Sequence, residues 1–165
     1  MTTMMAGGCQ CGAIRYALSV MPLRTGLCHC RMCQKAVGQP FAAYAIVPMA
    51  DLAWTRGTPP AFRSSTAAER HFCPECGTSL TFRYVDKDEI GMAVGTLDHP
   101  EQVVPSAHYG VESRLPWMAS SVLDGLEQEA TGDPGTPEAV LTLVDFQHPD
   151  HDTAEGWTPP RAGRS

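Results

Sequence analysis

Seven cysteines are the residues of this chain whose type and spacing point most directly to chemistry. They form three short groups: Cys9 with Cys11, Cys73 with Cys76, and Cys28 with Cys30 and Cys33. A structural Zn²⁺ ion takes four ligands in a tetrahedron, whereas a catalytic Zn²⁺ ion keeps three protein ligands and an open fourth position. The thiols therefore predict a structural zinc site built from the two cysteine pairs and a catalytic zinc site built from the group of three.

Two alternative roles for the cysteines fit the sequence less well. Disulfide bonds are disfavoured because the count is odd and because a C-x-C pair is too close for unstrained bridging. The first eight residues also lack the basic start and apolar run of a secretory signal. One structural zinc with three unrelated buried thiols is the second alternative, since free cysteine packs as a small hydrophobe. The ligand spacing of the group of three, with His29 inside it, argues against that alternative.

Length and charge exclude several classes of protein. The 165 residues, 43% of them hydrophobic, are enough for one domain with a real core. A net charge of -6 disfavours nucleic-acid binding, which relies on a basic face that neutralises phosphates. No run approaches the length of a membrane span, and reduced thiols fit a cytoplasmic location. We expect a soluble cytoplasmic protein without nucleic-acid or membrane partners, and the sequence leaves open whether it forms a homo-oligomer.

Short strands and turns are expected to position the cysteines, because 14 Pro and 15 Gly interrupt the chain too often for long helices. Period-two alternation predicts a strand over 12–19, with the C-x-C pair at its entrance. Residues i and i+2 of an extended segment point the same way, so both thiols of that pair can reach one metal. Further strands are predicted at 41–47, at 79–84 and 89–94 as a hairpin, and within 108–117.

The other cysteines are expected on a helix and a turn. Residues 30–37 predict a short helix that ends at Gly38, with Cys28 reaching the site from a preceding loop. Proline and glycine around Cys73 and Cys76 predict a tight knuckle whose amide N–H groups point at sulfur. Residues 51–60 are predicted to be a loop.

The composition divides the chain into a domain at 1–128 and a C-terminal tail at 129–165. From residue 131 onward the sequence is rich in Gly, Pro, Asp and His, which predicts a tail that is ordered at most in part. His148 and His151 lie in this tail and are expected in solvent.

Several motifs together resemble the glutathione-dependent formaldehyde-activating family. They are Gly8-Cys9-Gln10-Cys11-Gly12, Cys28-His29-Cys30-x-x-Cys33, Arg70-x-Phe72-Cys73-x-x-Cys76-Gly77, Gly95-Thr96-Leu97-Asp98 and Pro116-Trp117. Their order and spacing match over about residues 7–128. The resemblance implies a mainly β fold, the β-tent of small antiparallel sheets with short helices organised around zinc. It also implies two zinc ions per chain, divided between the cysteines as the spacing predicts.

The resemblance implies a zinc-dependent carbon–sulfur lyase that acts on the adduct of a small thiol and an aldehyde. Characterised members condense formaldehyde with glutathione to S-hydroxymethylglutathione. The catalytic group would be Cys28, Cys30 and Cys33, and we assign substrate binding to Lys35, His29 and His108. The alternative is a non-catalytic zinc-binding module that serves a protein partner, with a fourth ligand closing the site. Methionine sulfoxide reduction would need a reactive cysteine outside the metal sites, and the chain has none.

The sequence departs from the family's pattern near the group of three. Gln34 and Val37 stand where a basic residue and a hydroxyl are usual, and Gly110 replaces an aromatic residue, with Tyr109 adjacent. None of these changes touches a metal ligand. They predict that thiol binding is weaker or broader than in relatives with a fuller set of basic residues.

Overall fold

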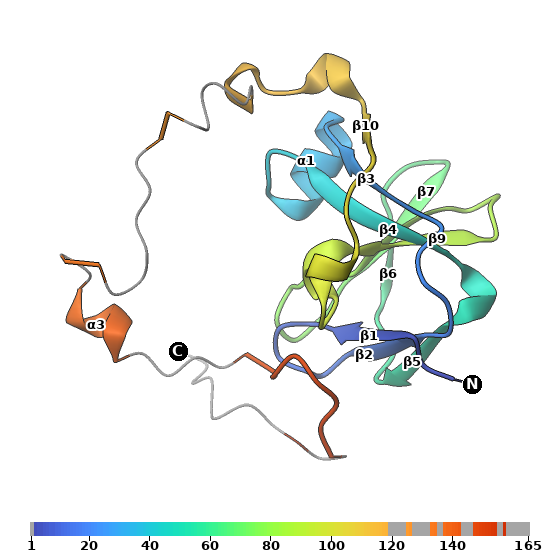
Figure 1. The fold of residues 1–165 in the computed structure, drawn as a ribbon. Coiled ribbons are helices and arrows are strands. Elements are labelled where there is room, and N and C mark those ends of the chain that lie inside the picture. The colour runs from blue at the N-terminus through green and yellow to red at the C-terminus, as the bar shows by residue number, and fades with distance from the viewer. Residues whose placement is uncertain are drawn as a thin grey trace.

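The chain folds into two packed β-sheets with one short helix beside the larger of them (Figure 1). The structure is a computed structural model, and it describes residues 2–118, 125–126, 133–134, 137–142, 147–154 and 157. None of the helices in these ranges is long and apolar enough to cross a bilayer.

The smaller sheet has three antiparallel strands in the order β1-β2-β5. Its strands are β1 (Met5–Gly8), β2 (Arg15–Leu18) and β5 (Leu52–Arg56). The prediction of a loop over 51–60 is therefore wrong for β5. The burial of β5 residues alternates only weakly, so its sequence carries no clear strand pattern. Pairing with β2, which sets Trp54 opposite Tyr16, decides its structure.

The larger sheet has seven strands in the order β10-β3-β4-β9-β8-β7-β6. In that order they are β10 (Ala107–Tyr109), β3 (Arg24–Cys28), β4 (Ala42–Pro48), β9 (Glu89–Ala93), β8 (Thr81–Tyr84), β7 (Ala68–His71) and β6 (Ala61–Arg63). Neighbours are antiparallel except β10 and β3, which are parallel. The fold is mainly β as predicted, although one of its sheets is larger than expected.

Helical segments in the described ranges are all short. They are α1 (Arg31–Val37), the turns η1 (Met49–Asp51), η2 (Val94–Thr96), η3 (Pro100–Gln102), η4 (Val111–Ser113) and η5 (Pro116–Met118), and α3 (Glu138–Leu141). The helix α1 ends as the sequence predicts, because Gly38 takes the left-handed conformation with φ 65°.

The hydrophobic core lies between the two sheets and fixes their relative positions. Buried side chains come from both sheets and from the chain that follows β9: Met5, Tyr16, Leu18, Ala45, Val47, Ile90, Met92, Leu97 and Val103. The Tyr16 hydroxyl is fully buried and lies 2.9 Å from the Thr96 hydroxyl, so the polar end of this ring is paired. The hairpin of β8 and β9 is confirmed, with Phe82 opposite Gly91.

The C-terminal segment 147–154 contacts the smaller sheet and the turn that holds Cys9 and Cys11. The His148 backbone N–H donates to the Gln10 carbonyl at 2.7 Å, and its ring nitrogen lies 2.9 Å from the Thr153 hydroxyl. The expectation that His148 is solvated is wrong, since only 3% of it is exposed. Gly12 makes this contact feasible, because a side chain there would collide with the imidazole ring.

Two arginines attach the same segment to the smaller sheet. Arg15 is buried and bridges two carboxylates, with Nη2 2.5 Å from Asp98 and 2.8 Å from Asp152. Arg56 donates from Nη2 to the Thr153 carbonyl at 3.0 Å. These contacts join the end of the chain to strands near its beginning.

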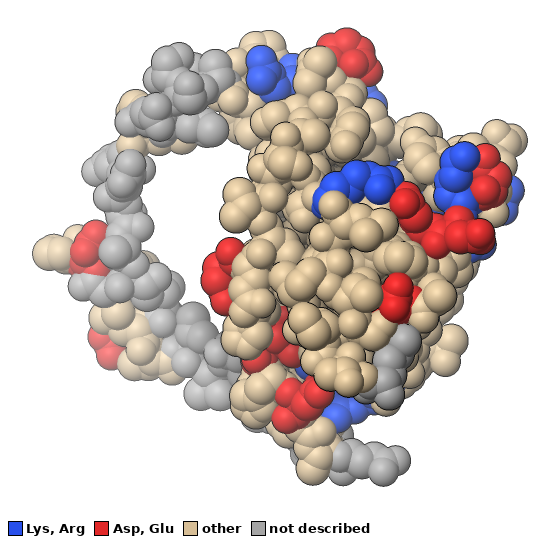
Figure 2. Space-filling view, turned by 45° about the vertical axis from the view of Figure 1, so that its right-hand side comes forward, with Lys and Arg blue, Asp and Glu red and all other residues tan. Residues whose placement is uncertain are grey.

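Charged residues on the visible surface are mixed in sign. Figure 2 shows Lys and Arg on that face in small groups beside Asp and Glu, without a continuous basic surface.

The burial of His148 predicts its effect on stability. His148→Ala should lower the midpoint of thermal unfolding by several degrees, because losing a buried hydrogen-bonded side chain costs about 1–3 kcal/mol. The matched control is His151→Ala, which changes an exposed histidine of the same segment. Differential scanning calorimetry of zinc-loaded protein checks this, and equal midpoints for the two variants would contradict the observed docking.

Candidate metal centres

Four thiols meet at the edge of the two sheets. The sulfur atoms of Cys9, Cys11, Cys73 and Cys76 all lie within 4.8 Å of one another. Cys9 Sγ is 3.6 Å from Cys11 Sγ, which is 3.8 Å from Cys73 Sγ. A tetrahedral zinc with Zn–S bonds of about 2.3 Å places its sulfur ligands roughly 3.8 Å apart. The four-cysteine group therefore fits the structural zinc site that the spacing predicts.

Backbone turns aim these thiols inward. The knuckle after β7 closes with the Gly77 N–H donating to the Cys73 carbonyl at 2.9 Å, and Gly77 has φ 77°. The Ile14 N–H lies 3.2 Å from Cys9 Sγ, as expected for an amide that stabilises a thiolate. Burial raises the pKa of the Cys76 thiol, but hydrogen bonds from the Thr78 hydroxyl and backbone outweigh it, and the pKa falls to about 6.

The second group of thiols lies where β3 meets α1. The sulfur atoms of Cys28, Cys30 and Cys33 lie within 4.8 Å of one another, and Cys28 Sγ is 3.5 Å from Cys30 Sγ. Cys28 is the last residue of β3, so the prediction that it comes from a loop is wrong. Cys30 caps α1, with its sulfur accepting from the Cys33 N–H at 3.4 Å. The distances fit three ligands of one tetrahedral zinc.

Buried polar contacts hold the loop that carries these thiols. Gln34 is buried in α1 and donates from Nε2 to the carbonyls of His29 at 2.7 Å and Ser113 at 3.1 Å. Gly110 has φ 63°, and a side chain there would approach the Cys30 backbone nitrogen to 2.8 Å. These two departures from the family's pattern therefore have a structural reason: both let the η4 turn pack on the thiol loop.

Arg70 places a positive charge against the three-cysteine group. Its Nη2 lies 3.4 Å from Cys33 Sγ, and its Nη1 donates to the Tyr44 hydroxyl at 2.8 Å. The guanidinium also lies over the Phe82 ring, 4.8 Å from its centroid. Burial raises the pKa of the Cys33 thiol, and Arg70 opposes that rise. From the sequence, Arg70 is named only as the first residue of a family motif, and its position just before the knuckle of Cys73 and Cys76 was the available signal.

The three thiols open into a cavity of about 570 Å³. Its walls come mostly from the larger sheet and are mainly apolar or aromatic, including Tyr44, Ile46, Phe82, Tyr84 and Tyr109. Gly26 on β3 makes room for the Tyr109 ring, which would collide with a side chain at that position. A site with these walls can bind a small organic molecule beside the sulfur atoms.

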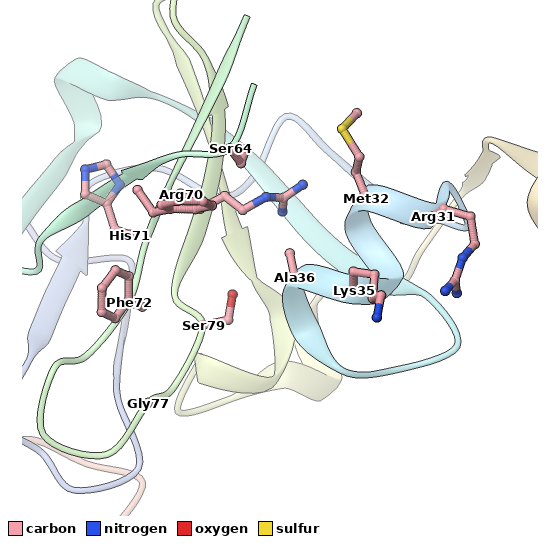
Figure 3. Close-up of a pocket in the computed structure, with 11 residues that line it drawn as sticks. Arg31, Met32, Lys35, Ala36, Ser64, Arg70, His71, Phe72, Gly77 and Ser79 are labelled. Carbon is pink, nitrogen blue, oxygen red and sulfur yellow. The ribbon is translucent and has the colours of Figure 1, made fainter. Parts of the chain in front are cut away.

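The three residues assigned to substrate binding lie in two places. His29 is 1% exposed, and its Nε2 is 2.9 Å from Nδ1 of His108, which belongs to β10 and not to a loop. Burial lowers the pKa of His29. Neither histidine lines the cavity at the three thiols, and Lys35 lines the neighbouring one, described below (Figure 3). Their roles in substrate binding stay predictions.

The family described as glutathione-dependent formaldehyde-activating enzyme matches residues 4–113. The chain belongs to this family. Within the match lie both cysteine groups, Arg70 and the strands that carry them. The resemblance inferred from the motifs is therefore confirmed.

Two individual proteins are also similar to the chain. An uncharacterized lyase of Schizosaccharomyces pombe is 31% identical over 80 residues, which cover 48% of this chain and 58% of that protein. The chain thus spans less than two thirds of that relative. A crystal structure of a Rhodobacter sphaeroides protein matches with a TM-score of 0.53 at 24% identity, covering 63% of this chain and 99% of that one. This second match supports the fold alone.

The geometry predicts two zinc ions held with unequal strength. Four thiolates would surround one ion, whereas three would leave the other open to competing ligands, so mild chelation should remove one zinc first. Elemental analysis during titration with a chelator checks this prediction. A single zinc on the three-cysteine group, with Cys73 and Cys76 free to react with a thiol reagent, would contradict the division.

The two sites should also differ in what their loss does. Cys73→Ser should unfold or aggregate the protein, because a small sheet fold draws folding free energy from its structural metal. Cys30→Ser should leave a folded protein, with a small loss from the weaker cap of α1. Circular dichroism and thermal scans of both variants test this, and equal losses would argue against distinct roles.

Proposed function

We propose that this protein is a lyase-like enzyme that makes and breaks the carbon–sulfur bond between a small thiol, such as glutathione, and an aldehyde. In the forward direction the thiol sulfur bonds to the carbonyl carbon while the C=O double bond becomes a C–OH single bond. The thiol proton ends on the new hydroxyl, so the reaction needs no oxidant or reductant. Cleavage of the adduct is the reverse of these changes.

One observation carries the proposal: three thiols face a cavity without a fourth protein ligand. In the described part of the chain, no histidine, carboxylate or further cysteine joins Cys28, Cys30 and Cys33. A zinc ion bound there would keep an open position and favour the deprotonated form of a substrate thiol that occupied it. The non-catalytic alternative needs that position closed by a protein ligand, and the described residues offer none.

The protein's own side chains would tune and shield this position. Arg70 sets a fixed positive charge beside Cys33, which balances part of the negative charge of three thiolates. The Tyr44 hydroxyl accepts a hydrogen bond from the Arg70 guanidinium, which fixes the direction of that side chain before substrate binds. Apolar side chains of Ile46, Phe82 and Tyr109 line the cavity beside the sulfur atoms, and a bound substrate would displace water from these walls.

His29 and His108 lie outside the thiol cavity and support the loop that carries its cysteines. His29 donates its backbone N–H to the Tyr109 carbonyl at 2.8 Å, and its ring contacts His108 on β10. This pairing ties the thiol loop to the edge strand of the larger sheet. We propose that the two histidines position the thiols and the wall of the cavity.

The reaction is tested by mixing ¹³C-formaldehyde, a panel of small thiols and zinc-loaded protein, with exchange NMR as the readout. We expect faster exchange between free and thiol-bound formaldehyde than without protein, for at least one thiol. Cys30→Ser, with the four-cysteine site still loaded, should abolish the acceleration. If no thiol of the panel shows faster exchange, although both sites of the wild type hold zinc, the non-catalytic module would be favoured.

A further inference from the structure

A second cavity of about 760 Å³ opens beside the cavity of the three thiols. Figure 3 shows its shape: Arg31, Lys35 and Ala36 of α1 stand on one side, and His71 and Phe72 on the other. We call this space, between α1 and the strands β6 and β7, the α1 groove. Of the residues that line it, Lys35, Ala36 and Phe62 lie outside the family's cysteine motifs.

The α1 groove borders the thiol cavity. Met32, Ser64 and Arg70 line both spaces, so each lies on their common border. In Figure 3 the Arg70 guanidinium extends from β7 toward α1 at this border. A molecule whose sulfur lies at the cysteines would cross this border to reach the groove.

Exposed apolar side chains line the groove. Met32 is 60% exposed, Phe62 61% and Phe72 36%, although each is a large hydrophobic residue. Such residues grouped around one hollow mark a binding surface more often than single exposed ones do. They would bury an apolar group of a ligand.

The groove also carries uncompensated positive charge. Lys35 forms no ion pair in the described part of the chain, and Arg31 donates to the neutral Gln34 side chain at 2.5 Å. No Asp or Glu is among the described residues that line the groove. Two such cations beside apolar rings fit an apolar group that ends in a carboxylate.

We propose that the α1 groove binds the distal part of the thiol substrate and selects peptide-like thiols with an apolar residue and a terminal carboxylate. The inference rests on the proposed function, because it places the sulfur at Cys28, Cys30 and Cys33. A short thiol fills only the first cavity, whereas one extended residue adds about 3.3–3.6 Å of reach toward Lys35. The groove would therefore favour a C-terminal aromatic residue over the glycine of glutathione.

Calorimetry with two matched tripeptides tests this selection. Both carry γ-glutamyl-cysteine, followed by glycine in one and phenylalanine in the other, and both are titrated into zinc-loaded protein. The phenylalanine peptide should bind roughly five- to tenfold tighter, because its ring is buried against Met32 and Phe62. Equal affinities, or tighter binding of the glycine peptide, would overturn the inference.

Variants locate the site. Phe62→Ser should remove the preference for phenylalanine, whereas Leu23→Ser, which changes a leucine that is 58% exposed and outside both cavities, should keep it. Lys35→Glu should weaken both peptides about fivefold, and Lys87→Glu, the matched charge reversal on the exposed turn after β8, should leave them unchanged. If Leu23→Ser and Lys87→Glu change peptide binding as much as Phe62→Ser and Lys35→Glu do, the peptides bind outside the α1 groove.

Serine analogues separate this inference from the proposed reaction. With serine in place of cysteine the peptides cannot present a thiol, yet the phenylalanine analogue should still shift the methyl resonance of Met32 and leave that of Met21 unchanged. If the Met32 resonance shifts but no thiol peptide reacts, the groove proposal stands and the proposed lyase reaction is rejected. If the thiol peptides react but the Met32 resonance does not shift and phenylalanine is not preferred, only the groove proposal is rejected.

Discussion

The convergence of Cys9 and Cys11 with Cys73 and Cys76 is the constraint on which the rest of the structure depends. Sulfur atoms separated by 62 residues in the sequence lie 3.8 Å apart, so the end of β1 must meet the end of β7. Ile14 and Leu80 are buried around these thiols, which gives the site a small apolar core of its own. Because β1 belongs to one sheet and β7 to the other, this meeting fixes the sheets relative to each other. The C-terminal segment strengthens the same corner, since His148 contacts the turn that holds the first cysteine pair.

The strand β7 couples this corner to the three-cysteine group. Arg70 lies on β7, three residues before Cys73, and its guanidinium reaches Cys33. A buried guanidinium without a partner would be costly, and so would the buried Cys33 thiolate, beside two partly exposed thiolates, without a counter-charge. Each therefore stabilises the charged form of the other, while Tyr44 and Phe82 fix the geometry. β7 thus connects the two cysteine groups, because it places Arg70 at one of them and leads into Cys73 of the other.

The sequence predicts those features that depend on local spacing and misses those that depend on distant pairing. The division of the thiols and the helix α1 follow from ligand intervals and from Gly38, which are local signals. β5 was missed because its burial comes from pairing with β2, and the burial of His148 because it requires Gly12, far away in the chain. The position of Lys35 was predictable: two residues after Cys33 on a helix, it points about 200° away from the thiol face. Helical geometry thus places Lys35 in the α1 groove and not beside the cysteines.

The residues that depart from the family's pattern show where selectivity has to be sought. Gln34 donates its side-chain hydrogen bonds to backbone carbonyls. Gly110 is required because the η4 turn closely approaches Cys30. Neither residue is among those that line the thiol cavity. Selectivity is then to be sought among the other residues that line the two cavities. Among the described residues, Met32 lies at the border between the two cavities while Phe62 and Lys35 lie beyond it, in positions that could change without disturbing a metal ligand. A fold that keeps its metal centres fixed can in this way alter the thiol that it accepts.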